Sequence, residues 1–149
     1  MSTRKLILTA LACGLAILVA GGVFLFNVAR NRDELTVPDA RRVGEVVEVG
    51  PYRAGVVRAD WSGDVLLVRV RVTAVEQRLL DAASPWSVLI GGAIAEVVDS
   101  PLSSVPPCGG TAVEQGGSLE CVLAYSADKA SGFAEFAVGE AKDRWFLPG

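Results

Sequence analysis

The sequence has no histidine among its 149 residues. Histidine is the usual general base of serine and cysteine hydrolases and the commonest protein ligand of zinc. Its absence excludes most hydrolase and zinc-dependent mechanisms. Phosphate-binding glycine loops are absent as well, because neither GxGxxG nor GxxxxGKS/T occurs although the chain has 16 glycines. We therefore expect no nucleotide, metal or other cofactor and no enzymatic activity.

Positive charge is scarce in the C-terminal part of the chain. Beyond Arg30 there are 11 Lys and Arg against 17 Asp and Glu, a net charge of −6. A phosphate backbone is bound by clustered basic side chains whose counterion release drives affinity. Because the sequence has no such cluster, we expect neither nucleic acid nor anionic lipid head groups as partners.

The N-terminal part carries the longest apolar run. Residues 6–29 contain no charged side chain, and at 1.5 Å per residue a helix of this length crosses a hydrocarbon layer of about 30 Å. We predict a cytoplasmic tip (1–5), a transmembrane anchor (6–29), a polar linker (30–42) and one extracytoplasmic domain (43–149). Ala12, Ala16 and Ala20 recur every four residues, so they form a candidate face for pairing with another helix.

Two alternatives to an uncleaved anchor have some support in the sequence. Ala20 and Gly22 form a small-x-small pattern at which a secretory signal could be cleaved, but the apolar run continues through residues 23–26. A lipid anchor on Cys13 would require leucine where the chain has Ala10. The flanking basic residues do not decide the orientation, because Arg4 and Lys5 are balanced by Arg30 and Arg32.

Cysteine supplies the argument for orientation. Cys108 and Cys121 are the only cysteines beyond the anchor, and such a pair in a small extracytoplasmic domain usually forms a disulfide. We therefore predict this bridge, with the N-terminus in the cytoplasm and the domain outside. Cys108 lies in the Pro-, Gly- and Ser-rich connection 100–117, and the bridge would attach this connection to the sheet. Closing the ring between the two cysteines would raise the free energy of unfolding by about 3 kcal/mol.

The domain has the alternating pattern of β-strands. In residues 64–75, apolar side chains at even positions from Leu66 to Ala74 point one way, and Arg69, Arg71 and Thr73 point the other way. Other predicted strands cover 45–49, 53–61, 86–90, 94–98, 119–125, 132–138 and 144–147, with turns at Gly63 and at Gly91–Gly92. One or two helical turns are expected within 75–83. We predict an all-β antiparallel sandwich, whose core holds most of the aromatic side chains.

Several segments resemble a known group of proteins. A strand of the form DVLLVRVRV (64–72), the turn and strand VEQGGSLECVLAYS (113–126) and the closing strand RWFLP (144–148) follow one another around a long middle loop. This order resembles the small extracytoplasmic immunoglobulin-like domains of Gram-positive, actinobacterial envelope proteins, which include a secreted mycobacterial antigen. The resemblance spans 43–148 and implies fold and location, and it carries no catalytic residues. The chain departs from the group in lacking a polar asparagine near Val75 and in having the cysteine pair.

Few side chains are candidates for a functional site. Arg58, Arg69 and Arg71 are candidates for a partner-binding patch on an exposed sheet face, although charged faces also keep sheets soluble. The carboxylates with the strongest claim to catalysis or calcium binding are Asp60, Asp64 and Asp99, which lie near turns but lack the ligand density of a calcium loop.

These observations lead to a hypothesis for the function. We expect a membrane-anchored, non-enzymatic module that binds another membrane or envelope protein. The alternative is a secreted antigen-like or small-ligand-binding protein, released by cleavage near Gly22.

Overall fold

The structure is a computed structural model that describes residues 3, 7, 11–14, 17–19, 21–22, 40–99 and 104–149. Two compact units follow each other in the chain, Met1–Pro38 and Asp39–Gly149. The described residues of the first unit are all helical and exposed. Among them no helix is long and apolar enough to span a membrane. Most of the predicted anchor, 6–29, lies outside the described residues.

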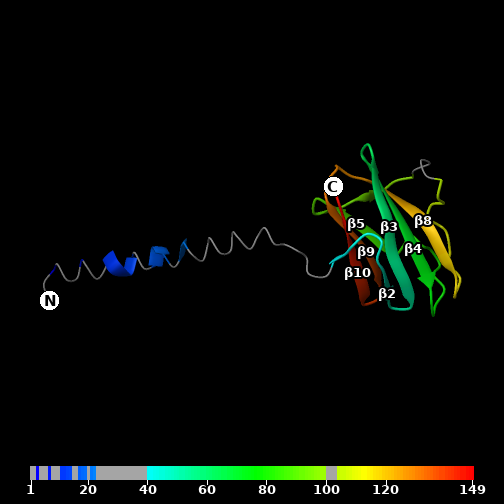
Figure 1. The fold of residues 1–149 in the computed structure, drawn as a ribbon, viewed down its shortest axis with the longest axis horizontal. Coiled ribbons are helices and arrows are strands. Elements are labelled where there is room, and N and C mark those ends of the chain that lie inside the picture. Colours follow the sequence, from blue (N-terminus) through cyan, green and yellow to red (C-terminus); the bar gives the residue numbers. More distant parts are fainter. Residues whose placement is uncertain are drawn as a thin grey trace. The chain divides into compact units, whose positions relative to one another are not determined.

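The second unit is a sandwich of two five-stranded sheets (Figure 1). Sheet A has the order β1-β10-β9-β5-β6, and sheet B has the order β2-β3-β4-β8-β7. The strands are β1 (Ala40–Arg41), β2 (Val46–Val49), β3 (Tyr52–Ser62), β4 (Val65–Ala74), β5 (Trp86–Ile90), β6 (Ala93–Ile94), β7 (Glu96–Val97), β8 (Ser118–Ser126), β9 (Gly132–Val138) and β10 (Ala141–Leu147). All neighbours pair antiparallel except β1 and β10. The predicted all-β sandwich is confirmed.

Strand β4 shows why the sequence folds this way. Its even-numbered apolar side chains, from Leu66 to Ala74, are all fully buried between the sheets, and the intervening residues face outward. Alternate side chains of a strand point to opposite faces, so one apolar stripe is enough to hold the strand against the core. The predicted orientation of this strand is confirmed.

Three aromatic side chains fill the space between the sheets. Trp86 lies with its ring 4.9 Å from Phe136 and 5.4 Å from Trp145 between centroids. The indole N–H of Trp145 donates a 2.8 Å hydrogen bond to the carbonyl of Glu45, which links sheet A to the connection between β1 and β2. Phe133 is different, because it is only partly buried and packs edge-on against Phe146 outside the core.

Two local predictions are corrected by the structure. The expected strand 94–98 is two short strands, β6 in sheet A and β7 in sheet B, separated by the buried Ala95. The expected helical turns within 75–83 do not form. The backbone of Leu79 instead exchanges two hydrogen bonds with Val113, and the N–H of Ala82 donates to the carbonyl of Thr111, so this segment pairs with the middle loop.

Candidate functional site

The three predicted arginines lie together on the outer face of sheet B. Arg58 on β3 is directly opposite Arg69 on β4, and Arg71 follows two residues later on the same face of β4. Strand alternation places them there, because the residues between them point into the core. A β-bulge between Val56 and Arg58 shifts the register of β3 and brings Arg58 opposite Arg69.

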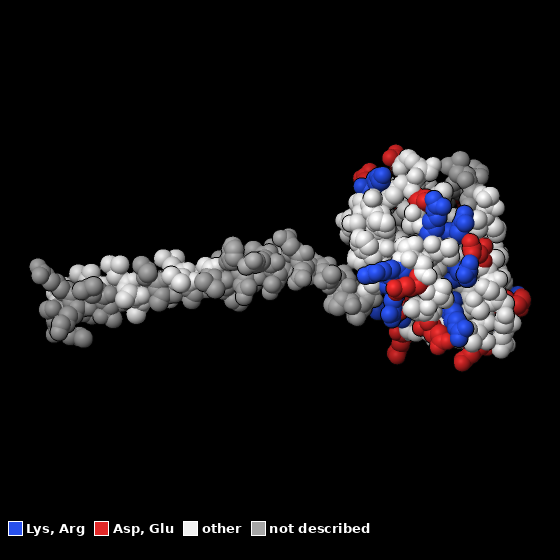
Figure 2. Space-filling view, viewed as in Figure 1, with Lys and Arg blue, Asp and Glu red and all other residues white. Residues whose placement is uncertain are grey.

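Two carboxylates neutralise much of this charge. Asp60 lies 2.7 Å from the guanidinium of Arg58, and Glu120 on β8 lies 2.7 Å from Arg71 and 3.8 Å from Arg69. Like charges directly opposite each other destabilise a sheet, so these carboxylates offset the repulsion between Arg58 and Arg69. Figure 2 shows blue and red side chains intermixed on this side of the sandwich. The face therefore offers exposed hydrogen-bonding groups and only a weak positive field.

The disulfide-pinned loop closes the neighbouring edge of the sheet. Cys108 and Cys121 form a disulfide with a Cα–Cα distance of 5.0 Å, which confirms the predicted bridge. The N–H of Cys108 donates to the carbonyl of Val122, and the N–H of Val122 donates to Pro106. These bonds attach the loop to β8 beside the end of β7. A loop fixed in this way is a suitable position for a binding surface.

The loop is also held from the side of the β4–β5 connection. One carboxylate oxygen of Asp81 accepts hydrogen bonds from the backbone N–H groups of Ala83 and Gly110, each 3.1 Å long. Because both bonds end on the same oxygen, Asp81 ties its own connection to the residues that follow Cys108. The two long connections therefore form one packed unit.

Two cavities accompany these features. One of about 340 Å³ is open to solvent and lies between residues 58–60 of β3, the crossover at Arg42 and Val43, and the end of β10 at Phe146 and Pro148. The other, of about 250 Å³, lies between the β7 end at Val97 and the pinned loop at Pro107 and Gly109. The sequence pattern gave no signal for either cavity, because each is lined by segments that are distant along the chain.

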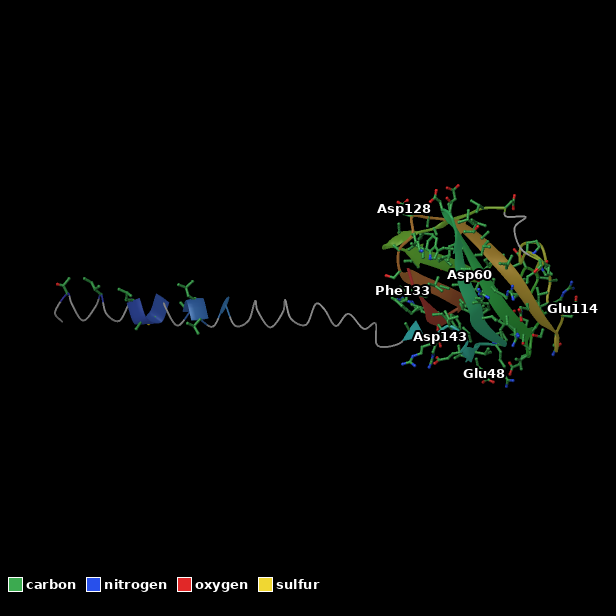
Figure 3. All side chains as sticks on the ribbon, turned by 45° about the horizontal axis from the view of Figure 1, so that its top comes forward. Glu48, Asp60, Glu114, Asp128, Phe133 and Asp143 are labelled. Atoms are coloured by element: carbon green, nitrogen blue, oxygen red, sulfur yellow. A yellow bond between two sulfur atoms is a disulfide. The ribbon has the colours of Figure 1, made fainter. Side chains whose placement is uncertain are left out.

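The structure does not gather the candidate carboxylates. Asp60 is held by Arg58, Asp64 lies in the β3–β4 turn, and Asp99 follows β7 at the other edge of the sheet. The acidic side chains labelled in Figure 3 are likewise dispersed over the sandwich. Within the described part of the chain, no three potential ligands come close enough to hold a metal ion.

The predicted helix-pairing face is described only in part. Ala12 is helical and exposed, whereas Ala16 and Ala20 lie outside the described residues. Cys13 is an exposed free thiol on the same segment. The pairing of this face with another helix stays a prediction.

Comparison with solved structures identifies proteins of similar fold. The secreted protein MPT63 of Mycobacterium tuberculosis aligns with a TM-score of 0.56 and 12% identity, over 72% of this chain and 96% of MPT63. YjhA of Bacillus subtilis aligns with a TM-score of 0.58 and 15% identity, over 64% of this chain and 79% of YjhA. The candidate lipoprotein YcdA of B. subtilis gives the same score and identity, over 70% of this chain but 38% of YcdA.

These similarities confirm the predicted resemblance to extracytoplasmic β-sandwich proteins, MPT63 among them. At 12–15% identity the likeness is one of fold. No protein-family model matches the sequence, and no curated protein matches it.

Sequence reasoning missed the residues that give the arginine patch its character. Glu120 is an exposed acidic residue in a strand, but its two arginine partners depend on the register between β4 and β8. Phe146 is 45% exposed and borders the cavity of about 340 Å³. The sequence predicted that it lies in the closing strand and gave no sign of the cavity.

Proposed function

We propose that this chain is a non-enzymatic β-sandwich module, tethered to the outside of a cell membrane by its N-terminal segment, that binds another membrane or envelope protein. The contacts would come from the arginine face of sheet B and the disulfide-pinned loop. The N-terminus would lie in the cytoplasm, with residues 6–29 as the anchor.

The observation that carries the tether is the exposure of apolar side chains on helical residues of the N-terminal unit. Ile7, Leu11, Ile17, Leu18 and Val19 are helical, and their side chains are between 57% and 76% exposed. Surface of this kind is stable when another apolar phase covers it. The uncharged run 6–29 is long enough for that phase to be a lipid bilayer.

Two features of the sandwich support binding as its role. The arginines form ion pairs with Asp60 and Glu120 on an exposed sheet face, so a partner would meet both charges and hydrogen-bonding groups there. The pinned loop beside them is restrained by a disulfide and by backbone bonds to β8. A non-enzymatic role fits the lack of histidine in the sequence.

The tether is tested by cell fractionation of the full-length protein. We expect it to stay in the membrane pellet after an alkaline wash, and mass spectrometry should find the peptide that contains Thr3 and Arg4. A protein that is recovered outside the cell and begins near Val23 would overturn the tether and support the secreted alternative, a role like that of the secreted MPT63.

Binding is tested by purifying the full-length protein from its native membranes in mild detergent. We expect a second protein in stoichiometric amount. The variant Arg69→Ser/Arg71→Ser should lose this partner, whereas Arg144→Ser should keep it, because Arg144 lies on sheet A and pairs with Glu135 there. If no partner is present, binding is refuted. If the double variant retains the partner, the arginine face is not the contact.

A further inference from the structure

Strand β3 has one open edge. On the side away from β4, β2 pairs with residues Tyr52 to Gly55, and the N–H of Gly44 reaches the carbonyl of Val56. From residue 57 to 62, no strand of the described part of the chain pairs with this side. Unpaired strand edges are templates for adding another strand.

The backbone of this edge is oriented for pairing. Ser62 and Val65 flank the two-residue turn of the β3–β4 hairpin, and residues opposite each other in an antiparallel ladder alternate between bonded and non-bonded pairs. Asp60 and Arg58 therefore direct their N–H and C=O groups toward β4. Ala59 and Trp61 direct theirs toward the open edge.

A cavity open to solvent lies beside the edge. It has a volume of about 340 Å³ and lies between residues 58–60 on one side and Arg42, Val43, Pro148 and the partly exposed ring of Phe146 on the other. An added strand would therefore meet an opening with an apolar wall. The occupant must match the residue pattern of the edge.

The edge sequence is complementary to itself. Residues 57–61 read Val-Arg-Ala-Asp-Trp. When two copies run antiparallel with Ala59 opposite Ala59, each Arg58 faces Asp60 of the other copy. This register also suits the backbone. The N–H and C=O groups of Ala59 point to the open edge, so the two Ala59 residues can form a hydrogen-bonded pair across the contact. Moving the register by one step of two residues would place Arg58 opposite Arg58 or Asp60 opposite Asp60.

We propose that the open edge of β3 is a self-association site, at which a second copy of this chain adds its own β3 antiparallel, centred on Ala59. The contact is isologous and closes as a two-fold dimer. It joins the two copies of sheet B into one continuous sheet. A strand edge with a different order of charges would place like charges opposite Arg58 or Asp60 and would be repelled. The site is therefore selective for a second copy of this chain. This inference concerns self-association and does not depend on the partner proposed above.

Cross-linking tests the register. Two tagged full-length chains, both with Cys13→Ser, carry Arg58→Cys and Asp60→Cys respectively and are mixed in liposomes under mild oxidation. In the proposed register their Cα atoms are about 4.5 Å apart, within the range of a disulfide, whereas identical positions are about 8 Å apart. We expect rapid cross-linking in the mixture and slow cross-linking in each variant alone. Equal rates in all three samples would overturn the proposal, and would be the result if the N-terminal helices alone formed a dimer.

Charge exchange tests the chemistry. Arg58→Asp and Asp60→Arg each place like charges opposite each other, so we expect the concentration for half-maximal dimerisation, measured by energy transfer, to rise about tenfold. The double variant Arg58→Asp/Asp60→Arg restores both pairs and should return to within about twofold of the original. Arg53→Asp, on the closed half of β3, is the matched control and should change little. A protein that does not dimerise, or a double variant as weak as the single ones, refutes the site.

Discussion

The two edges of sheet B are closed to different degrees. The β8 edge is covered by β7 at Tyr125 and Ser126 and by the disulfide-pinned loop at Val122. The β3 edge is covered by β2 along Tyr52–Gly55 and is open beyond Val56 within the described residues. Exposed backbone groups make an edge prone to association, so proteins usually cover such edges or place charges on them. Here the β8 edge is covered from Val122 to Ser126, and the open part of the β3 edge carries charged side chains.

The difference shows where each edge gets its specificity. Closing the β8 edge needs segments that are distant in sequence, including Glu96–Val97, the connection around Cys108 and the Asp81 segment that supports it. The β3 edge depends on five consecutive residues. Stability should therefore respond strongly to changes at the β8 edge, and association should respond to changes at the β3 edge. Unfolding and association, both measured on the full-length protein in mild detergent, separate these two responses.

Removing the disulfide should give the largest loss of stability. In Cys108→Ser/Cys121→Ser the free energy of unfolding should fall by about 3 kcal/mol, because the unfolded chain regains the freedom of a closed ring with a sequence separation of 13 residues. Urea unfolding followed by tryptophan fluorescence measures this change. Cys13→Ser is the control and should leave the midpoint unchanged. A double variant as stable as the original would mean that the loop is held by its backbone bonds alone.

Most of the longer strands, and one face of β4, were predictable because they depend on local alternation. The even-numbered residues from Leu66 to Ala74 were predicted as the buried set, and all are fully buried. The Gly91–Gly92 turn was also predictable, since both glycines adopt positive φ angles of 58° and 87°, which two-residue hairpin turns favour. The Cys108–Cys121 bridge followed from the number of cysteines and from the expected extracytoplasmic location of the domain.

Features that depend on distant segments could not be predicted. Residues 75–83 have a helix-like pattern, but the backbone of Leu79 pairs with that of Val113, 34 positions away along the chain. The three arginines were predicted as one patch from alternation alone. Their carboxylate partner Glu120 required the β4–β8 register, and the open cavity at Phe146 required the packing of β10 near β3.

Proline substitutions compare the two sides of β3 directly. Asp60→Pro removes an N–H that points toward β4, and we expect a loss of about 2 kcal/mol in the free energy of unfolding. Ala59→Pro removes an N–H that points to the open edge, so the loss should be less than about 1 kcal/mol. Both are measured by urea unfolding at a concentration where the protein is monomeric. Equal losses would show that the backbone of Ala59 is already bonded.

Alkaline pH should weaken the closed side of the sheet through Tyr125. This side chain on β8 is 2% exposed, and its burial raises the pKa of the hydroxyl from 10.0 to about 12. The folded state holds this proton more tightly than the unfolded state. The contribution of the protonated hydroxyl to the free energy of unfolding is therefore complete below pH 10 and is lost as the pH rises through 12. At pH 11 we expect a loss of about 1.4 kcal/mol relative to Tyr125→Phe, which lacks the titrating group. Parallel pH profiles of the two proteins would contradict this assignment.

The smallest expected effect tests how the pinned loop is supported. Asp81→Ala removes the oxygen that accepts from Ala83 and Gly110, at a cost of about 1 kcal/mol, because both N–H groups lose their partner in a partly exposed site. Asp81→Asn keeps an acceptor oxygen and should lose much less. In the alanine variant, hydrogen exchange should accelerate at residues 108–113, which lose the bond to Asp81. Exchange in the β3 peptides should stay unchanged, because the disulfide still attaches the loop to β8 and the opening stays local. If exchange were to accelerate equally in β3, the two edges of sheet B would open as one unit. The edges would then differ only in the segments that cover them and would not differ in local stability.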